Sequence, residues 1–491
     1  MKWRRSGVVV AAAAAVQWLC LSALLGGALG LVLSAAPQRR GPPRSTALPP
    51  VPSPPPPAPY APGPATPVYS VSVSGVVPGW ANKSLHKVHV GVVLPHSTFR
   101  ARHYRHTLVT TLTALAKTKP GLASGILGQT HDIEATVVTV SHKPSPTTIL
   151  NILCQHFLRR NVSAILLLSN SETYGRETAS AEYFMQLADY LRIPVIAWNN
   201  AGLERRATRS SLQLQLAPSL AHQTAAVLSV LQRYKWHQFS VVTSQIAGHD
   251  EFIQAVRDAV HRVQGTFKLV LLQALVVSPH EPDLGPLVSS ETRIVLLYCT
   301  REEAKTILGA AAKLRLNGTD YLWLATQSVI GSAMEAPDEF PVGMLGIHFP
   351  TDADELLQQL SRALRVFATA LDQFVRDAAL PAPAAPGGPR GAPAPARHPL
   401  LPRLTCEGGA GETRWSGGEL FYRYLRASRV EQEGGRAGLE FQADGSLRAA
   451  QLQVLNLQPQ RKMLSHKQWV EVRNPPTFQQ LPVFLECRCP L

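Results

Sequence analysis

Residues 234–250, YKWHQFSVVTSQIAGHD, run from the end of one helix through an apolar strand and out through a glycine to the start of another helix. The apolar run FSVVT is bounded by polar residues, which is typical of a strand buried in a sheet. A strand that leads into a helix is the repeating unit of α/β proteins. This stretch therefore predicts a parallel sheet, and its neighbours show how far that sheet extends.

The alternation of strand and helix continues in both directions. Upstream, Ser145 is a good N-cap and Pro146 suits the first helical position, where its missing N–H costs nothing. The pattern predicts upstream strands at 87–94, 133–140, 162–169 and 193–198, with helices at 99–117, from 146, and at 176–190. After residue 215 it restarts, with strands at 237–243, 267–276, 293–299, 321–326 and 343–348 and helices at 219–234, 249–263 and 301–315.

Two lobes are expected, because 491 residues are too many for one compact core. The fold class is α/β, with each lobe a doubly wound, mostly parallel sheet. Two such lobes in tandem place their ligand-facing loops around a shared cleft, as in a clamshell. An amphipathic helix at 353–379 is long enough to return to the first lobe, and the remaining segments complete the sheets: a helix at 417–428 and strands near 439–442, 450–456 and 467–472.

Segments outside the lobes are marked by composition. The basic start, the apolar stretch Val8 to Leu33 and the small residues before Pro37 indicate a secretory signal peptide, with an uncleaved membrane anchor as the alternative. Prolines crowd into 37–68 and 381–402, where an ordered core rarely tolerates them. The predicted organisation is a signal peptide 1–36, a disordered Pro-rich segment 37–85, a bilobed domain 86–475 (first lobe about 86–215 plus returning segments, second lobe about 216–350, disordered loop 381–404) and a tail 476–491.

The composition also argues against several classes of function. The net charge of +15 comes largely from arginines in the leader and the Pro-rich segments, and no basic face follows from it, so we predict no nucleic-acid partner. No Gly-x-Ser-x-Gly elbow, His-Glu-x-x-His motif or paired-cysteine framework occurs, so we predict neither an enzyme nor a cofactor. His103 and His106 share a helical face, and a solvated polar face explains them better than a metal.

Export changes the expected chemistry of the six cysteines, because disulfides form in oxidising compartments. Cys20 lies in the leader, which leaves five, so at least one stays free or pairs with another chain. Cys487 and Cys489 lie in the tail and receive no assigned role. Asn-x-Ser/Thr triplets predict glycosylation on a surface, at Asn82, Asn161 and Asn317.

Four stretches give the chain a resemblance to a known family. YKWHQFSVVTSQIAGHDEF, IVLLYCTREEAKTIL (294–308), EFPVGMLGIHF (339–349) and LEFQADGSLRAAQLQVLNLQ (439–458) resemble the amino-terminal domain of NMDA-type ionotropic glutamate receptor subunits of the second class. They look closest to arthropod or other invertebrate versions, and the resemblance covers roughly 86–475. It implies a periplasmic-binding-protein type I clamshell, a disulfide between Cys154 and Cys406, and an unpaired, buried Cys299.

The resemblance also implies which residues border the cleft between the lobes: His96, Asn199, Gln245, Ile246, Glu302 and Glu303. Zinc-inhibited members of the family carry a histidine where this chain has Asn199, and a lone His96 cannot form a tight zinc site. We therefore predict no metal site. Ile246 and Ala247 replace an aromatic residue and a proline of the subtype that binds aromatic blockers. Glu302 and Glu303 open a helix, where acidic residues complement the dipole without further chemistry.

The function implied by the resemblance is subunit assembly and allosteric modulation of gating in a glutamate-gated cation channel. The implied partner is a subunit of the first class, with a small molecule or ion as a modulator in the cleft, on the extracellular, postsynaptic side of the membrane. The chain ends where the family begins its agonist-binding domain, so we expect a fragment or a shortened isoform. Its membrane association would depend on downstream segments or an uncleaved leader. The alternative is a freestanding secreted solute-binding protein with the same fold.

Overall fold

The computed structural model describes residues 68–72, 86–95, 101–117, 131–140, 144–168, 178–198, 211–246, 248–331, 334–379, 401–402, 404–406, 413–430, 438–459, 461–463, 469–471 and 477–488. All of these belong to one compact unit, Pro64–Leu491. The predicted leader 1–36 and most of the loop 381–404 lie outside the described residues. Within the described part, no helix combines the length and the apolar character that a membrane span requires.

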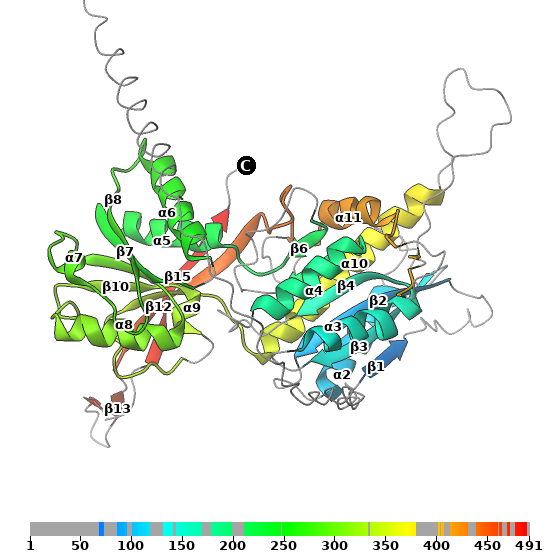
Figure 1. Cartoon of the computed structure of the whole chain (residues 1–491), viewed down its shortest axis with the longest axis horizontal. Helices are drawn as coiled ribbons and strands as arrows, with labels where there is room; N and C mark the ends of the chain where they lie inside the picture. Colours follow the sequence, from blue (N-terminus) through cyan, green and yellow to red (C-terminus); the bar gives the residue numbers. More distant parts are fainter. Residues whose placement is uncertain are drawn as a thin grey trace, which may run out of the picture. The chain divides into compact units, whose positions relative to one another are not determined.

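The first sheet has six strands in the order β1-β3-β2-β4-β5-β6 (Figure 1). All of its pairings are parallel except that of β1 with β3. Every residue of β4 and β5 is buried, as expected for parallel strands covered on both faces. The strands are β1 (Val68–Ser72), β2 (His86–Pro95), β3 (His131–Val140), β4 (Val162–Leu168), β5 (Val195–Trp198) and β6 (Gln213–Gln215).

Helices from two distant parts of the chain cover this sheet. Ser145 caps one of them by accepting a hydrogen bond from Thr148 N at 3.1 Å, and Pro146 is its first residue, as predicted. A hydrogen bond of 3.1 Å between Thr111 and Ser361 ties an early helix to the long returning one. The helices are α2 (Ala101–Lys117), α3 (Pro146–Asn151), the π-helical turn η1 (Ile152–Phe157), the 3₁₀ turn η2 (Leu158–Arg160), α4 (Thr178–Tyr190), α10 (Ala353–Ala379) and α11 (Gly418–Ala427).

The second sheet has seven strands in the order β15-β12-β11-β10-β9-β7-β8. Its five strands from β8 to β11 run parallel, whereas β12 and β15 are antiparallel additions at one edge. The strands are β7 (Gln238–Ser244), β8 (Val270–Val277), β9 (Ile294–Tyr298), β10 (Leu322–Ala325), β11 (Leu345–His348), β12 (Ala449–Gln458) and β15 (Thr477–Arg488). The helices are α5 (Leu220–Arg233), α6 (His249–Val263), α7 (Gly285–Val288), α8 (Arg301–Lys313) and α9 (Gln327–Ile330), and a separate hairpin pairs β13 (Arg461–Met463) with β14 (Trp469–Glu471).

The chain passes between the two sheets three times within the described residues. It leaves β6 for α5 at 216–219, leaves β11 for α10 at 349–352, and passes from α11 to β12 in a connection whose described residues are 428–430 and 438–448. We call these the crossing segments. The structure has two doubly wound sheets, and the chain crosses repeatedly between them. This is the architecture of the two-lobed, type I periplasmic-binding-protein clamshell.

Four strands, β1, β6, β13 and β15, lie where the sequence predicted none. β1 falls in the predicted Pro-rich segment 37–85 and pairs with β3, and β6 was not predicted. β15 falls in the predicted tail 476–491 and pairs with β12 along its length, so the folded domain extends beyond residue 475. The predicted strand at 439–442 is reduced to isolated bridges, which pair Leu439 with Val430 and Phe441 with Leu447.

Candidate functional site

Four of the six predicted cleft residues lie within the described residues, and they gather at the carboxyl ends of β7 and β9. His96 and Asn199 lie outside the described residues. Gln245 follows β7 and is exposed, whereas Ile246 beside it is only 5% exposed and packs into the core. The sheet order makes β7 and β9 neighbours, so the loops that follow them meet at one edge.

Glu303 joins these two loops. Its carboxylate Oε2 accepts hydrogen bonds from Thr300 N and Thr300 Oγ1, both at 2.9 Å, which completes a capping box at the start of α8. The same oxygen accepts a hydrogen bond of 2.8 Å from Ser244 Oγ at the end of β7. Glu302, by contrast, points outward and pairs with Lys305 Nζ at 2.6 Å. Through these hydrogen bonds, Glu303 links the end of β7 to the start of α8 at the edge of the second sheet.

Aromatic packing closes the space behind this edge. Phe252 stacks on Tyr298 with ring centroids 4.2 Å apart, and Cys299, the next residue along the chain, is fully buried in a separate core cluster. Burial, with a smaller effect from the nearby Glu303 carboxylate, raises the pKa of the Cys299 thiol well above its usual value. A neutral, enclosed thiol is a poor nucleophile, so Cys299 acts here as a small apolar side chain.

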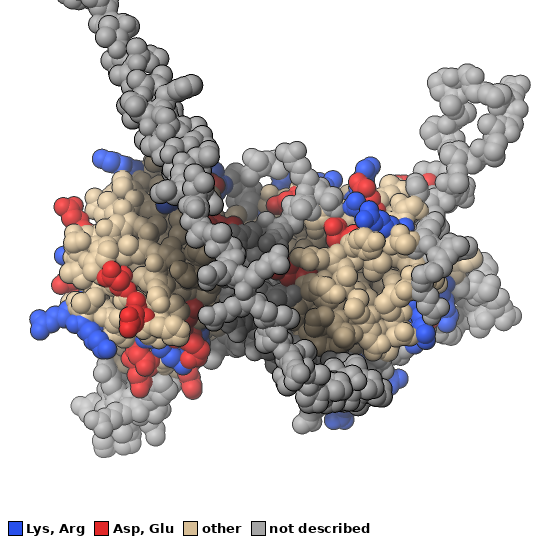
Figure 2. Space-filling view, viewed as in Figure 1, with Lys and Arg blue, Asp and Glu red and all other residues tan. Residues whose placement is uncertain are grey.

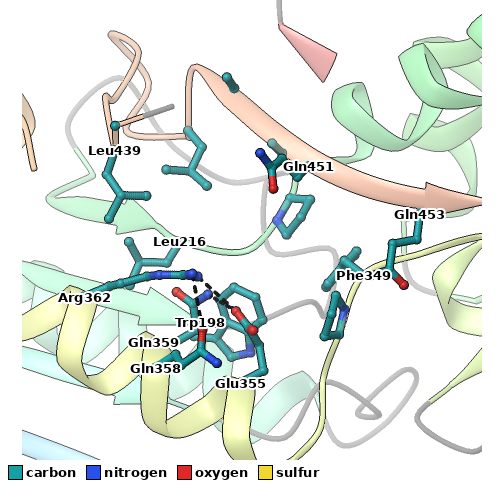
Figure 3. A pocket seen from close by; sticks show the side chains of 16 residues that line it. Trp198, Leu216, Phe349, Glu355, Gln358, Gln359, Arg362, Leu439, Gln451 and Gln453 are labelled. Carbon is teal, nitrogen blue, oxygen red and sulfur yellow. Dashed lines mark hydrogen bonds and ion pairs between the residues drawn. The ribbon is translucent and has the colours of Figure 1, made fainter. Parts of the chain in front are cut away.

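A pocket of about 270 Å³ lies where the crossing segments meet (Figure 3). Each crossing segment supplies apolar lining residues, such as Leu216, Phe349 and Leu447. We call this cavity the crossing pocket. Its other lining residues come from the end of β5, the first turns of α10 and the segments around β12: Trp198, Pro218, Pro350, Glu355, Gln358, Gln359, Arg362, Gly438, Leu439, Ala449, Ala450, Gln451 and Gln453.

One wall of the crossing pocket carries a partly buried ion pair on α10. Arg362 lies 2.9 Å from Glu355 Oε1, and the two side chains are 18% and 15% exposed. Gln359 Nε2 also donates to that oxygen, at 2.6 Å. The wall is therefore polar and its two formal charges neutralise each other.

Aromatic side chains form another wall. Trp198 and Phe349 make an edge-to-face contact, and both rings are almost fully buried. The backbone N–H of Phe349 donates to Gln327 Oε1 at 3.0 Å, which fixes the chain as it leaves β11. The crossing pocket thus has an apolar wall as well as a polar one.

Two buried histidines flank the crossing segments. His222 begins α5 and accepts a hydrogen bond at Nδ1 from Ser219 N, at 3.2 Å, which requires a neutral ring. His348 ends β11 and is 3% exposed. Burial lowers the pKa of each ring to about 4, and the nearby carboxylates of Asp444 and Asp352, respectively, oppose that shift.

The modification sites inferred from the sequence fall on elements of both sheets. A disulfide joins Cys154 in η1 to Cys406, with Cα atoms 5.7 Å apart, and ties the helical cover of the first sheet to the segment before α11. Asn161 precedes β4 with a left-handed backbone (φ 52°), and Asn317 lies in the connection between α8 and β10. Asn82 lies outside the described residues.

Charge and metal chemistry give no second site within the described part of the chain. Figure 2 shows acidic and basic side chains interspersed among broad uncharged areas on the face in view. Among the described residues, no group of three or more His, Cys, Asp and Glu side chains is arranged to hold a metal ion. The crossing pocket was missed by the sequence analysis, because its residues come from segments up to about 250 positions apart.

Two comparisons with known proteins bear on this site. The sequence model of a family described as "Receptor family ligand binding region" matches residues 123–460, which include all three crossing segments. The human protein "Glutamate receptor ionotropic, NMDA 2C" is 27% identical over 246 residues, which is 49% of this chain and 20% of that protein. The matched part of the chain thus spans about a fifth of the length of that relative.

Proposed function

The chain belongs to the receptor ligand-binding-region family, and on that premise we propose that it is the extracellular amino-terminal domain of an NMDA-type glutamate receptor subunit. The similarity to the human NMDA 2C protein supports this proposal over other members of the family. Assignment to the second subunit class and closeness to invertebrate versions stay predictions. The domain works by binding and movement rather than by catalysis.

The observation that carries the proposal is the threefold passage of the chain between two parallel sheets. Two sheets linked by crossing segments can rotate about those segments, as in hinge closure of two-lobed binding domains. Such a rotation modulates a channel only if the two arrangements differ in free energy for some ligand or contact. In this proposal the domain assembles with a subunit of the first class and biases gating through that rotation.

Receptor chimeras test the proposal. The amino-terminal domain of the human NMDA 2C receptor is replaced by the compact unit Pro64–Leu491 of this chain, which includes β1, and the chimera is expressed with a first-class subunit. Agonist-gated open probability is then compared with that of a receptor lacking the domain. We expect surface assembly and an open probability that differs from the deleted receptor. A chimera that cannot be distinguished from the deletion would overturn the proposal.

A freestanding solute-binding protein is the second candidate, because the crossing pocket offers a small, two-walled cavity on a clamshell fold. Isothermal titration of the full secreted chain against free amino acids separates the two functions. Tight binding of an amino acid by the isolated chain, together with failure to assemble with a first-class subunit, would favour the secreted carrier.

A further inference from the structure

We propose that the crossing pocket binds a small uncharged aromatic compound that carries an amide-like hydrogen-bond donor and acceptor, and that this ligand restrains the crossing segments. The inference rests on the pocket's own residues and does not depend on the receptor assignment. None of the residues that line this cavity is among the predicted cleft residues.

The size of the cavity limits the ligand. Its volume of about 270 Å³ lies just below the range of about 300–1,000 Å³ that is typical of small-molecule sites. The cavity therefore suits one ring with a short substituent better than a peptide or a nucleotide.

The apolar wall of the crossing pocket favours a ligand that contains an aromatic ring. Trp198 and Phe349 present aromatic surface, and Leu216, Leu439 and Leu447 surround it with aliphatic surface. Aromatic rings gain from edge-to-face and offset-stacked contacts in addition to burial. An aromatic ligand can use both kinds of contact here.

The polar wall disfavours a net charge on the ligand. Glu355 and Arg362 already neutralise each other at 2.9 Å, so a charged ligand would be attracted by one of them and repelled by the other, and would find no unpaired opposite charge on this wall. Moving a charged group out of water without its own opposite charge is costly. A neutral ligand avoids that cost.

Hydrogen-bonding capacity on this wall points to an amide. Gln359 is 3% exposed, and its Nε2 donates to Glu355 Oε1, while its amide oxygen accepts no hydrogen bond from any described residue. That oxygen is available to a ligand N–H. On the facing side, Figure 3 shows Gln451 of β12 directed toward the cavity, with an amide N–H₂ that can donate to a ligand carbonyl.

The position of the pocket links binding to movement. All three crossing segments contribute lining residues, so a ligand held among them favours the arrangement in which these segments stay together. Binding to one arrangement stabilises it by a free energy that grows with the logarithm of ligand concentration over Kd. The bound ligand therefore opposes rotation of one sheet relative to the other.

Three single-ring probes of similar size test the chemistry on the full chain. Benzamide is neutral, benzoate is an anion and benzylammonium is a cation. Binding is measured by saturation-transfer NMR and isothermal titration at one pH near 7.5. We expect benzamide to bind at least about fivefold more tightly than either charged probe, the factor set by one desolvated charge or one lost hydrogen bond. Equal binding of all three, or no binding of benzamide, overturns the proposal.

Variants test the location. Gln451→Trp places a large ring in the mouth of the cavity from an exposed position, and Gln359→Leu removes the amide oxygen at similar volume. Gln254→Trp on the exposed face of α6 is the matched control. Benzamide binding should be abolished by Gln451→Trp, fall at least about fivefold with Gln359→Leu, and persist in Gln254→Trp. Unchanged binding in Gln451→Trp with an intact circular-dichroism spectrum overturns the assignment, even if Gln359→Leu fails to fold.

Discussion

Trp198 and Phe349 meet edge to face with ring centroids 6.1 Å apart, although one ends a strand of the first sheet and the other follows a strand of the second. Both are almost fully buried, at 5% and 2% exposure, so the contact closes the core where the chain changes sheets. The aromatic pair joins the two lobes directly.

Truncating this contact is expected to cost stability. Phe349→Ala should lower the free energy of unfolding by about 3–5 kcal/mol, and Phe349→Leu by clearly less, because leucine leaves a much smaller cavity than alanine. Urea titration followed by circular dichroism measures both. Equal losses for the two variants would contradict a cavity-based cost.

The disulfide is expected to stabilise the domain by closing a very long loop. Cys154 and Cys406 are 252 positions apart, and the chain-entropy model gives about 5–6 kcal/mol for a loop of this length. The double variant Cys154→Ser/Cys406→Ser should unfold at lower urea concentration than the wild type, and dithiothreitol should destabilise only the wild type. Cys299→Ala, which leaves the disulfide in place, is the control and should keep its sensitivity to the reductant.

Glu302 and Glu303 are adjacent in the sequence, but their side chains contribute differently to the stability of the fold. Glu303→Ala removes the capping box of α8 and the bond from Ser244, so we expect a loss of about 1–2 kcal/mol in the free energy of unfolding. Glu302→Ala removes an exposed partner of Lys305 and should change stability by less than about 0.5 kcal/mol. The comparison uses thermal unfolding at one salt concentration, and the reverse ranking would show that the cap is not what Glu303 provides.

Gly445 sits in the third crossing segment with a left-handed backbone (φ 87°). A Cβ there would lie 2.1 Å from the carbonyl oxygen of Gln213, and Gly445 O already accepts a hydrogen bond from Gln215 N at 2.9 Å. Gly445→Ala should therefore destabilise by about 1–3 kcal/mol. Gly265→Ala, where a Cβ would meet no atom within 4 Å, is the matched control and should melt within a degree or two of the wild type (about 0.5 kcal/mol).

Acid is expected to weaken the fold through His222 and His348. Their folded-state pKa values of about 4 lie below the ordinary value of 6.5, so the unfolded chain binds more protons between these limits. Stability is therefore full above about pH 6.5 and is lost as the pH falls toward 4, by about 2 kcal/mol per histidine at pH 5. Asp132, whose pKa burial raises to about 6, opposes this trend.

The variant His348→Gln isolates one of these contributions. Urea unfolding of the wild type and of the variant is compared at pH 7.5 and pH 5.0. The loss of stability between these two values should be about 2 kcal/mol smaller in the variant. An identical pH dependence in both proteins would show that His348 does not titrate as its burial requires.

The regular elements were predictable because their periodicity is local. The predicted helices 249–263 and 353–379 coincide with α6 and α10. The misses are elements defined by distant partners: β6 has only three residues, and β15 contains Pro482 opposite an irregularity of register, so neither carries a clear strand pattern. The cap made by Glu303 could be predicted from Thr-x-x-Glu, whereas the crossing pocket could not, because no local pattern brings Trp198, Glu355 and Gln451 together.

An odd number of passages between the sheets has a mechanical consequence. Within the described residues the first strand, β1, belongs to one sheet and the last, β15, belongs to the other. With an even number of passages, both terminal strands would belong to the same sheet. With three passages, a partner attached near β15 moves with the second sheet, whereas contacts made near β1 hold the first sheet. Rotation about the crossing segments therefore displaces β1 and β15 relative to each other. In this arrangement the rotation axis passes near Trp198 and Phe349.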